Sequence, residues 1–258
     1  MIRRFLLAIQ FLTIFPLSLR AAHERDLSGS MVFYPLVGAM LGLILTGMAV
    51  FFHVLFDGVG ANNYSPLPVL FVILLWVIFT GGLHLDGLAD TLDGFVGGKD
   101  KESTLAIMRD PAIGTMGALG IFFVLAFKWG ALCALCNVVV GANNYSPLPL
   151  SLPFVMATGR YLMVLGAFVS RYPHTEGAGK SYIGKIPLSV FLTASLFMLV
   201  IAVATFQIKG LFLLLAALGG SALWVVYCHR RIGGMTGDTL GALGEVSEAV
   251  LLVVLCAR

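Results

Sequence analysis

Long apolar segments, separated by short polar connections, form the dominant pattern of this sequence. They cover residues 31–56, 67–83, 113–136, 150–170, 187–207, 210–228 and 243–257. Each is close to the ~20 residues that a membrane-spanning helix needs, so the pattern predicts about seven transmembrane helices. A shorter apolar stretch at 5–19 contains Gln10 and Pro16 and follows Arg3 and Arg4. We expect a retained interfacial or re-entrant helix there, and a cleavable signal peptide is the alternative.

The composition is that of a membrane protein rather than of a soluble domain. Hydrophobic residues make up 59% of the 258 positions and charged residues only 11%, and the mean hydropathy is +0.97. These values predict an all-α polytopic membrane protein, folded as a single domain over residues 1–258 in the lipid bilayer. The net charge of +3 comes without a basic stripe interleaved with aromatic residues, so no nucleic acid is expected as a partner.

Lys and Arg are distributed unevenly over the polar connections, and this predicts the orientation in the membrane. Four arginines precede the first long apolar run, whereas residues 57–66 contain no basic residue and residues 137–149 no charge. Cytoplasmic loops carry the excess of Lys and Arg, so the N-terminus should be cytoplasmic, with Lys209 as the one exception to the alternation. The chemically rich segments then share the cytoplasmic side, and the candidate active-site segments are 81–117, 171–186 and 229–248.

The nonapeptide GANNYSPLP occurs twice, at 60–68 and at 141–149, although the flanking sequences are not alike. Its Asn, Ser and Pro residues are typical of a solvent-exposed turn. We therefore assign it no catalytic role.

The stretch GGLHLDGLADTLDGF at 81–95 carries the strongest chemical signal. Asp86, Asp90 and Asp93 lie at i, i+4 and i+7, so a helix places all three carboxylates on one face. Three acids of one sign repel one another, and a divalent cation, usually Mg²⁺, neutralises such a cluster. The alternative is a solvated acidic turn. His84, beside them, is either a ligand or base or a structural interfacial histidine.

The segment MRDPAIGT at 108–115 allows two compatible interpretations. Asp110 and Pro111 are favourable residues at a helix start, so Asp110 is expected to cap the following helix while Arg109 faces lipid headgroups. The functional interpretation places Arg109 on a phosphate, because its planar guanidinium binds phosphate oxygens bidentately.

A third cluster lies near the end of the chain. Asp238, Glu245 and Glu248 share one helical face, and both glutamates fall inside the last apolar segment. Acids within a membrane are functional by default, and the alternative is an ion pair with Arg160 or Lys128 that only orders the bundle. Arg160 lies near mid-span and requires an anionic partner, whereas the long Lys128 side chain is expected to reach the outer interface.

The acidic and basic residues together indicate a type of chemistry. The glycine-rich loop PHTEGAGK at 173–180 ends in Lys180, which is a candidate to cover a phosphate, although the loop lacks the strand and spacing of a P-loop. Carboxylates on two segments, facing arginines and a lysine, fit Mg²⁺-assisted phosphoryl transfer. No Ser or Cys has an evident paired His and carboxylate, so nucleophilic hydrolysis is disfavoured.

At these residues the chain resembles the bacterial cobalamin synthase family, the adenosylcobinamide-GDP ribazoletransferases. The resemblance rests on GGLHLDGLADTLDGF (81–95), IMRDPAIGTMGALG (107–120) and GMTGDTLGALGEVSE (234–248), and it covers nearly the whole chain outside the two nonapeptides. It implies a multi-pass enzyme of the bacterial inner membrane that uses Mg²⁺ and joins adenosylcobinamide-GDP to α-ribazole 5′-phosphate or α-ribazole. GMP would leave and adenosylcobalamin 5′-phosphate would form, a late step of cobalamin biosynthesis.

The resemblance also gives roles to the candidate residues. The expected metal ligands are Asp86, Asp90, Asp93, Asp238 and Glu245. The residues expected on substrate are Arg109, Arg160 and Lys180 at phosphates, with His84 and Asp110 as further candidates. Asp90 or Asp93 is expected to accept the proton of the attacking hydroxyl, with Arg109 completing the catalytic set.

Two other functions are weighed against this one. CDP-alcohol phosphotransferases also carry aspartates on membrane helices, but their string has Ala-Arg four residues after the first Asp-Gly, and here Leu88, Ala89 and Asp90 follow. A cation-coupled transporter places acids at mid-membrane, whereas here they gather at one boundary without paired broken spans. The sequence does not decide between a monomer and a homo-oligomer.

Overall fold

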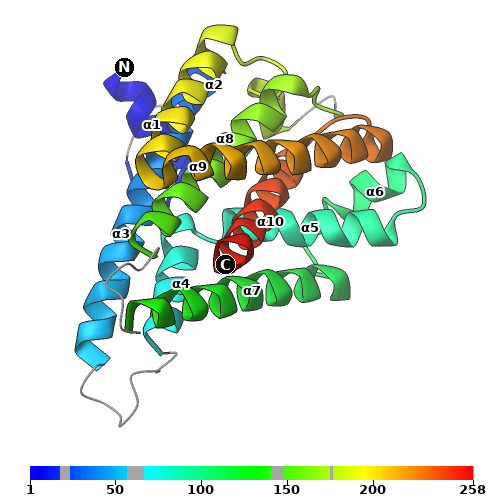
Figure 1. Ribbon diagram of the computed structural model, residues 1–258. Coiled ribbons are helices and arrows are strands. Elements are labelled where there is room, and N and C mark those ends of the chain that lie inside the picture. Colours follow the sequence, from blue (N-terminus) through cyan, green and yellow to red (C-terminus); the bar gives the residue numbers. More distant parts are fainter. Residues whose placement is uncertain (18–23, 57–66, 141–147, 175–176, 258) are drawn as a thin grey trace.

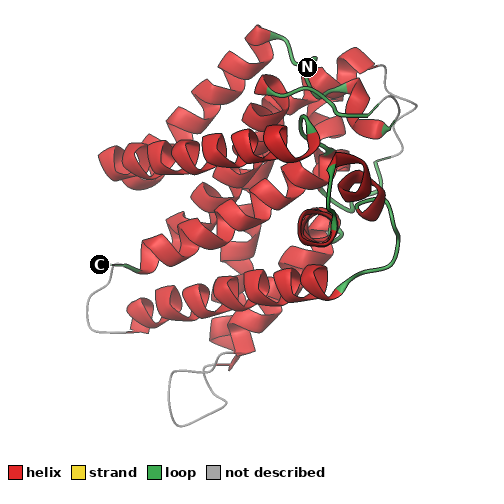
Figure 2. Cartoon of the chain, turned by 90° about the vertical axis from the view of Figure 1, so that its right-hand side faces the viewer, coloured by secondary structure: helices red, strands yellow, loops and turns green. Residues whose placement is uncertain are grey.

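The computed structural model describes residues 1–17, 24–56, 67–140, 148–174 and 177–257, and every regular element in these ranges is a helix (Figures 1 and 2). In chain order they are α1 (Ile2–Leu12), α2 (Glu24–Ser30), η1 (Met31–Phe33), α3 (Tyr34–Phe56), α4 (Leu67–Thr80), α5 (Leu83–Gly97), α6 (Lys101–Ile107), α7 (Thr115–Val140), α8 (Leu148–Val169), η2 (Ala178–Ser181), α9 (Leu188–Ile232) and α10 (Gly237–Cys256). Residues 60–66 and 141–147, most of the two nonapeptides, lie outside the described ranges.

The long helices confirm an all-α polytopic membrane protein. Within the described ranges, five helical segments are long and apolar enough to cross a membrane, and the bent pair α4–α5 makes six. The expected runs 187–207 and 210–228 form one element, α9, but Gln207 has non-helical angles (φ 52°, ψ −134°) and divides it into two helical segments. With these counted separately the number reaches the predicted seven. Figure 1 shows the change of direction along α9.

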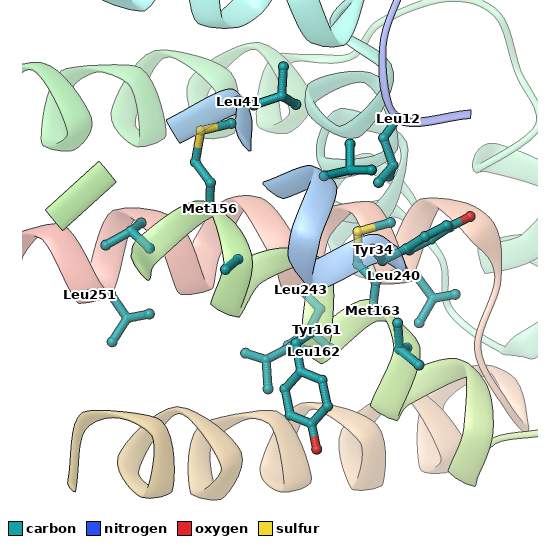
Figure 3. Packing of buried hydrophobic residues seen from close by; sticks show 14 of the residues in the cluster. Leu12, Tyr34, Leu41, Met156, Tyr161, Leu162, Met163, Leu240, Leu243 and Leu251 are labelled. Atoms are coloured by element: carbon teal, nitrogen blue, oxygen red, sulfur yellow. The ribbon is translucent and has the colours of Figure 1, made fainter. Parts of the chain in front are cut away.

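The core of the molecule is built around α8, in which every residue from 151 to 164 is buried. Glycines let α3 approach it closely: a Cβ on Gly38 would lie 2.5 Å from the Met156 carbonyl oxygen, and one on Gly42 would lie 2.5 Å from that of Leu152. Such small residues allow helix backbones to pack tightly in membranes, where dispersion contacts replace the hydrophobic driving force. Figure 3 shows the resulting layer of apolar side chains, with Met156 directed toward Leu41.

The turn between α4 and α5 orients the acidic helix. The two helices meet at 86°, and the chain turns through Gly81 and Gly82, whose φ values are 62° and 66°. Only glycine adopts this left-handed conformation without a steric cost, so the Gly-Gly pair permits the bend. As a result α5 leaves the direction of α4 and packs against α7 and α10. In Figure 1, α10 lies in the middle of the molecule, below α9 and above α7.

The N-terminal stretch forms a helix only up to Leu12. Beyond it the chain is extended, and the backbone N–H of Ile14 donates to the carbonyl oxygen of Phe79 at 2.9 Å. Leu7, Ala8 and Leu12 are buried against the rest of the molecule. The N-terminal helix is therefore packed onto the bundle at the turn that precedes α5.

Candidate active site

The structure brings the acids of two distant segments together where α5 crosses α10. The predicted helical face is confirmed, with Asp86 exposed and Asp90 and Asp93 half-buried on α5. A Cβ on Gly87 would lie 2.7 Å from the Cα of Asp238, the second residue of α10. The negative charges of Asp86, Asp238 and Asp93 all act on Asp90. We call Asp86, Asp90 and Asp238 the carboxylate cluster.

Asp93 has a structural partner of its own. One carboxylate oxygen accepts from the backbone N–H of Gly114 at 2.7 Å and the other from that of Gly117 at 2.8 Å. These donors belong to the start of α7, where backbone N–H groups lack helical partners. The expectation that Asp110 would cap this helix is wrong, because α7 begins at Thr115 and the Asp110 side chain accepts from the Ala112 N–H instead, at 2.9 Å.

The carboxylate cluster has the donor chemistry that Mg²⁺ prefers. Mg²⁺ is bound by oxygen ligands, commonly through one or two carboxylates together with substrate phosphates and water. Among the described residues, no group of three or more His, Cys, Asp or Glu side chains is close enough to hold a metal ion. The cluster thus fits an ion that is shared with the substrate better than one held in a closed protein cage.

Basic and aromatic residues of two loops lie next to the carboxylate cluster. The pKa of Tyr172 is raised, mainly by burial. The Arg109 guanidinium opposes this rise and the negative charge of Asp238 adds to it, so Tyr172 lies near both Arg109 and Asp238. Burial lowers the pKa of His174, and the charges of Arg109 and Lys101 lower it further. Predicted segments 81–117, 171–186 and 229–248 are therefore neighbours in space.

Hydrogen bonds fix the loop at 171–174 to the segment that leads into α10. Arg171 Nε donates to the Gly233 carbonyl oxygen at 2.8 Å, and the Met235 N–H donates to the Arg171 carbonyl oxygen at 3.0 Å. Arg231 Nη2 donates to the carbonyl oxygen of Phe95 at 3.0 Å, which attaches the end of α5 to the end of α9. These bonds hold the polar loops against the helices that carry the acids.

The remaining acids of α10 form a buried ionic cluster deeper in the bundle. Lys128 Nζ lies 2.7 Å from Glu245 Oε2 and 2.7 Å from Glu248 Oε2, and Arg160 Nη1 lies 3.1 Å from Glu248 Oε1. Lys128 also lies 4.1 Å from the centroid of the Trp76 ring. The structure therefore shows the ion pairs that the sequence left as an alternative. The expectation that Lys128 reaches the outer interface is wrong, since only 2% of this residue is exposed.

The other predicted site residues are distributed around these two clusters. Glu245 belongs to the ionic cluster, two helical turns beyond Asp238, and is not brought to the carboxylate cluster. Arg160 is fully buried on α8, also in the ionic cluster. Lys180 is exposed on η2, and Arg109 and Asp110 are exposed after α6. His84 is 2% exposed, and within the part of the chain that the structure describes neither of its ring nitrogens has a hydrogen-bond partner.

Several residues near the site were not singled out from the sequence. Tyr172, His174 and Tyr182 lie close to Asp238 or to Arg109, and Lys101 lies close to His174, as their electrostatic interactions show. They stand singly in polar connections, without a spacing that marks them. The only signal in the sequence was that these connections belong to the segments already predicted to carry the chemistry.

Fold and site together define an integral membrane protein of helices, with a carboxylate cluster that faces basic loops at one end of α5 and α10. The family model described as cobalamin-5-phosphate synthase matches residues 4–256. A curated adenosylcobinamide-GDP ribazoletransferase of Syntrophobacter fumaroxidans is 39% identical over 249 residues, which cover 95% of this chain and 94% of the relative. One from Klebsiella pneumoniae is 34% identical over 264 residues, covering 99% and 100%.

The chain belongs to the cobalamin-5-phosphate synthase family. No solved structure matches it.

Proposed function

We propose that this protein is an adenosylcobinamide-GDP ribazoletransferase of cobalamin biosynthesis. It joins adenosylcobinamide-GDP to α-ribazole 5′-phosphate, or to α-ribazole, and releases GMP. Family membership over almost the entire chain and the activity for which its relatives are named support the assignment. The observation that carries it is the meeting of Asp86 and Asp90 on α5 with Asp238 on α10, beside the basic loops.

The reaction is a transfer at phosphorus. The 3′-hydroxyl oxygen of the ribazole forms a new bond to the phosphorus that the cobinamide arm carries, and the P–O bond to GMP breaks. GMP leaves with that electron pair, and the hydroxyl proton passes to a carboxylate, for which Asp90 is our candidate.

Mg²⁺ would be held by one or two carboxylates of the cluster of Asp86, Asp90 and Asp238, with substrate phosphates as further ligands. When bound, it would supply positive charge against the pyrophosphate oxygens. Asp93 contributes only through the lone pairs that its two bonds to the α7 backbone leave free. Its main contribution is to fix the start of α7 against α5. Glu245 is engaged with Lys128 and is left out of this ligand set.

The basic residues are proposed to bind the phosphates of the donor substrate. Arg109 is exposed beside Tyr172 and His174, and its flat guanidinium suits bidentate contact with phosphate oxygens. Lys180 on η2 and Lys101 at the start of α6 add positive charge to the same region. The excess of Lys and Arg in these connections also supports a cytoplasmic position of the site in the inner membrane.

The assignment is tested with purified protein in detergent or vesicles. With Mg²⁺, adenosylcobinamide-GDP and α-ribazole 5′-phosphate, it should release GMP and form one cobamide per GMP. A CDP-alcohol should give no CMP, and proteoliposomes should take up no ions. Failure to release GMP would contradict the assignment. So would release of CMP from a CDP-alcohol, or an uptake of ions that Asp90→Asn abolishes.

A further inference from the structure

A cavity borders Asp238 of the carboxylate cluster. Its volume is ≈ 60 Å³, and since about 10–15 Å³ of this measure holds one water molecule, it takes about four to six waters. Six elements contribute to its walls, from α1 to α10. The residues on which the argument rests are Phe11, Tyr34, Leu83, His84, Tyr182 and Asp238.

His84 gives this cavity an unsatisfied polar wall. The residue is 2% exposed, yet neither Nδ1 nor Nε2 has a hydrogen-bond partner among the described residues. A buried polar group without a partner has lost its hydration without compensation, so such groups are normally paired with protein, water or ligand. Because His84 lines the cavity, whatever fills the cavity is in position to bond with the imidazole.

The other walls are aromatic and apolar. The ring of Phe11 stacks on Tyr34 with centroids 5.9 Å apart and meets the edge of Tyr182 at 5.9 Å. Figure 3 shows Tyr34 close to Met163 and Leu240, two further lining residues. Among the described residues that line the cavity there is no Lys or Arg. Such walls suit a flat, weakly polar ring, and the negative charge of Asp238 in the lining disfavours a phosphate.

We propose that this cavity binds the planar heteroaromatic base of the acceptor nucleotide. The inference rests on the proposed function and names the subsite for its second substrate. A base held between the aromatic walls, with a ring nitrogen bonded to His84, places its ribose on the side of Asp238, where the carboxylate cluster lies. Guanine fits less well, because its many polar groups would face mostly apolar walls.

The test measures both substrates separately. Leu83 is 49% exposed at the cavity wall, so Leu83→Trp should fold normally and occupy the space. His84→Phe keeps a ring but removes both nitrogens. Each change should raise the KM for α-ribazole 5′-phosphate about tenfold or more, the loss expected for a missing hydrogen bond or filled pocket, while the KM for adenosylcobinamide-GDP stays within about twofold.

Equilibrium dialysis of α-ribazole 5′-phosphate without the donor gives a second readout, with the same tenfold weakening expected. His53→Gln is the matched control. His53 lies on α3, nineteen residues beyond the cavity residue Tyr34, which is about 28 Å along the helix. This variant should therefore bind and turn over both substrates as wild type does. An unchanged acceptor KM and dialysis constant in Leu83→Trp and His84→Phe would overturn the subsite. A wild type that binds the acceptor but releases no GMP would instead contradict the proposed function alone.

Discussion

Removal of the Lys128 charge should strongly destabilise the protein. Lys128 Nζ is the only cation among the described residues within 4.0 Å of Glu245, and it shares Glu248 with Arg160. Lys128→Met leaves Glu245 buried, at 3% exposure, without a counter-charge. Removing one partner of a buried ion pair costs about 3–5 kcal/mol, because the other charge is left unpaired.

The magnitude translates into a measurable shift. In a protein of 150–250 residues, 1 kcal/mol corresponds to about 2–4 °C in Tm, so Lys128→Met should lower Tm by about 6–20 °C. The double variant Lys128→Met/Glu245→Gln keeps one acid, Glu248, opposite one base, Arg160. It should therefore recover most of the loss, and this recovery distinguishes an unpaired charge from a packing defect.

Thermal unfolding of the detergent-purified variants provides the assay, at one scan rate because membrane proteins often unfold irreversibly. Lys209→Met is the control, since Lys209 is exposed on α9 and its removal should change Tm by less than 2 °C, as for most surface changes of about 0.5 kcal/mol. If Lys128→Met matches wild type, or if the double variant is as unstable as the single one, the ionic cluster does not stabilise the bundle as argued.

Four further predictions follow from individual contacts. Gly87→Ala should lower stability by about 1–3 kcal/mol and also lower GMP release, because its Cβ would lie 2.7 Å from the Asp238 Cα. The control is Gly130→Ala: its Cβ would have no atom within 4 Å among the described residues, so this variant should be neutral or stabilising in thermal unfolding. Asp93→Ala should cost about 1–2 kcal/mol in the same assay, through loss of two bonds to the start of α7; an unchanged Tm would refute the cap. EDTA should abolish GMP release and Mg²⁺ should restore it, so EDTA-resistant turnover would exclude the ion. Arg109→Lys should raise the KM for adenosylcobinamide-GDP about tenfold with little effect on the KM for the acceptor, since Lys lacks the planar guanidinium that binds phosphate oxygens bidentately. An equal rise in the two KM values would argue against contact between Arg109 and the donor substrate.

The sequence alone predicted the parts of this molecule that depend on local periodicity. The apolar runs gave the long helices, and the spacing of Asp86, Asp90 and Asp93 gave their common face on α5. Both patterns follow from the 3.6-residue repeat of the helix and need no knowledge of the rest of the chain.

Contacts between distant segments were beyond such reasoning. Lys128 pairs with Glu245 over 117 positions, and nothing in either segment distinguishes this choice from a lysine that extends to the membrane surface. Likewise the start of α7 is capped by Asp93, 21 positions upstream of Gly114, although the adjacent Asp110 has the better local signature. The cavity at His84 depends on six elements at once, so no single segment reveals it.

The convergence of α5 and α10 on one substrate-bound ion is tested most directly by metal binding. Mn²⁺ can replace Mg²⁺ as a paramagnetic probe, and its binding in the presence of adenosylcobinamide-GDP can be followed by electron paramagnetic resonance. Asp90→Asn on α5 and Asp238→Asn on α10 should each weaken binding of the same single ion by about tenfold or more, equivalent to about 1.4 kcal/mol. Glu102→Gln, an exposed acid on α6, should have no effect. If Asp238→Asn binds Mn²⁺ like wild type while Asp90→Asn does not, the two helices do not share a metal site.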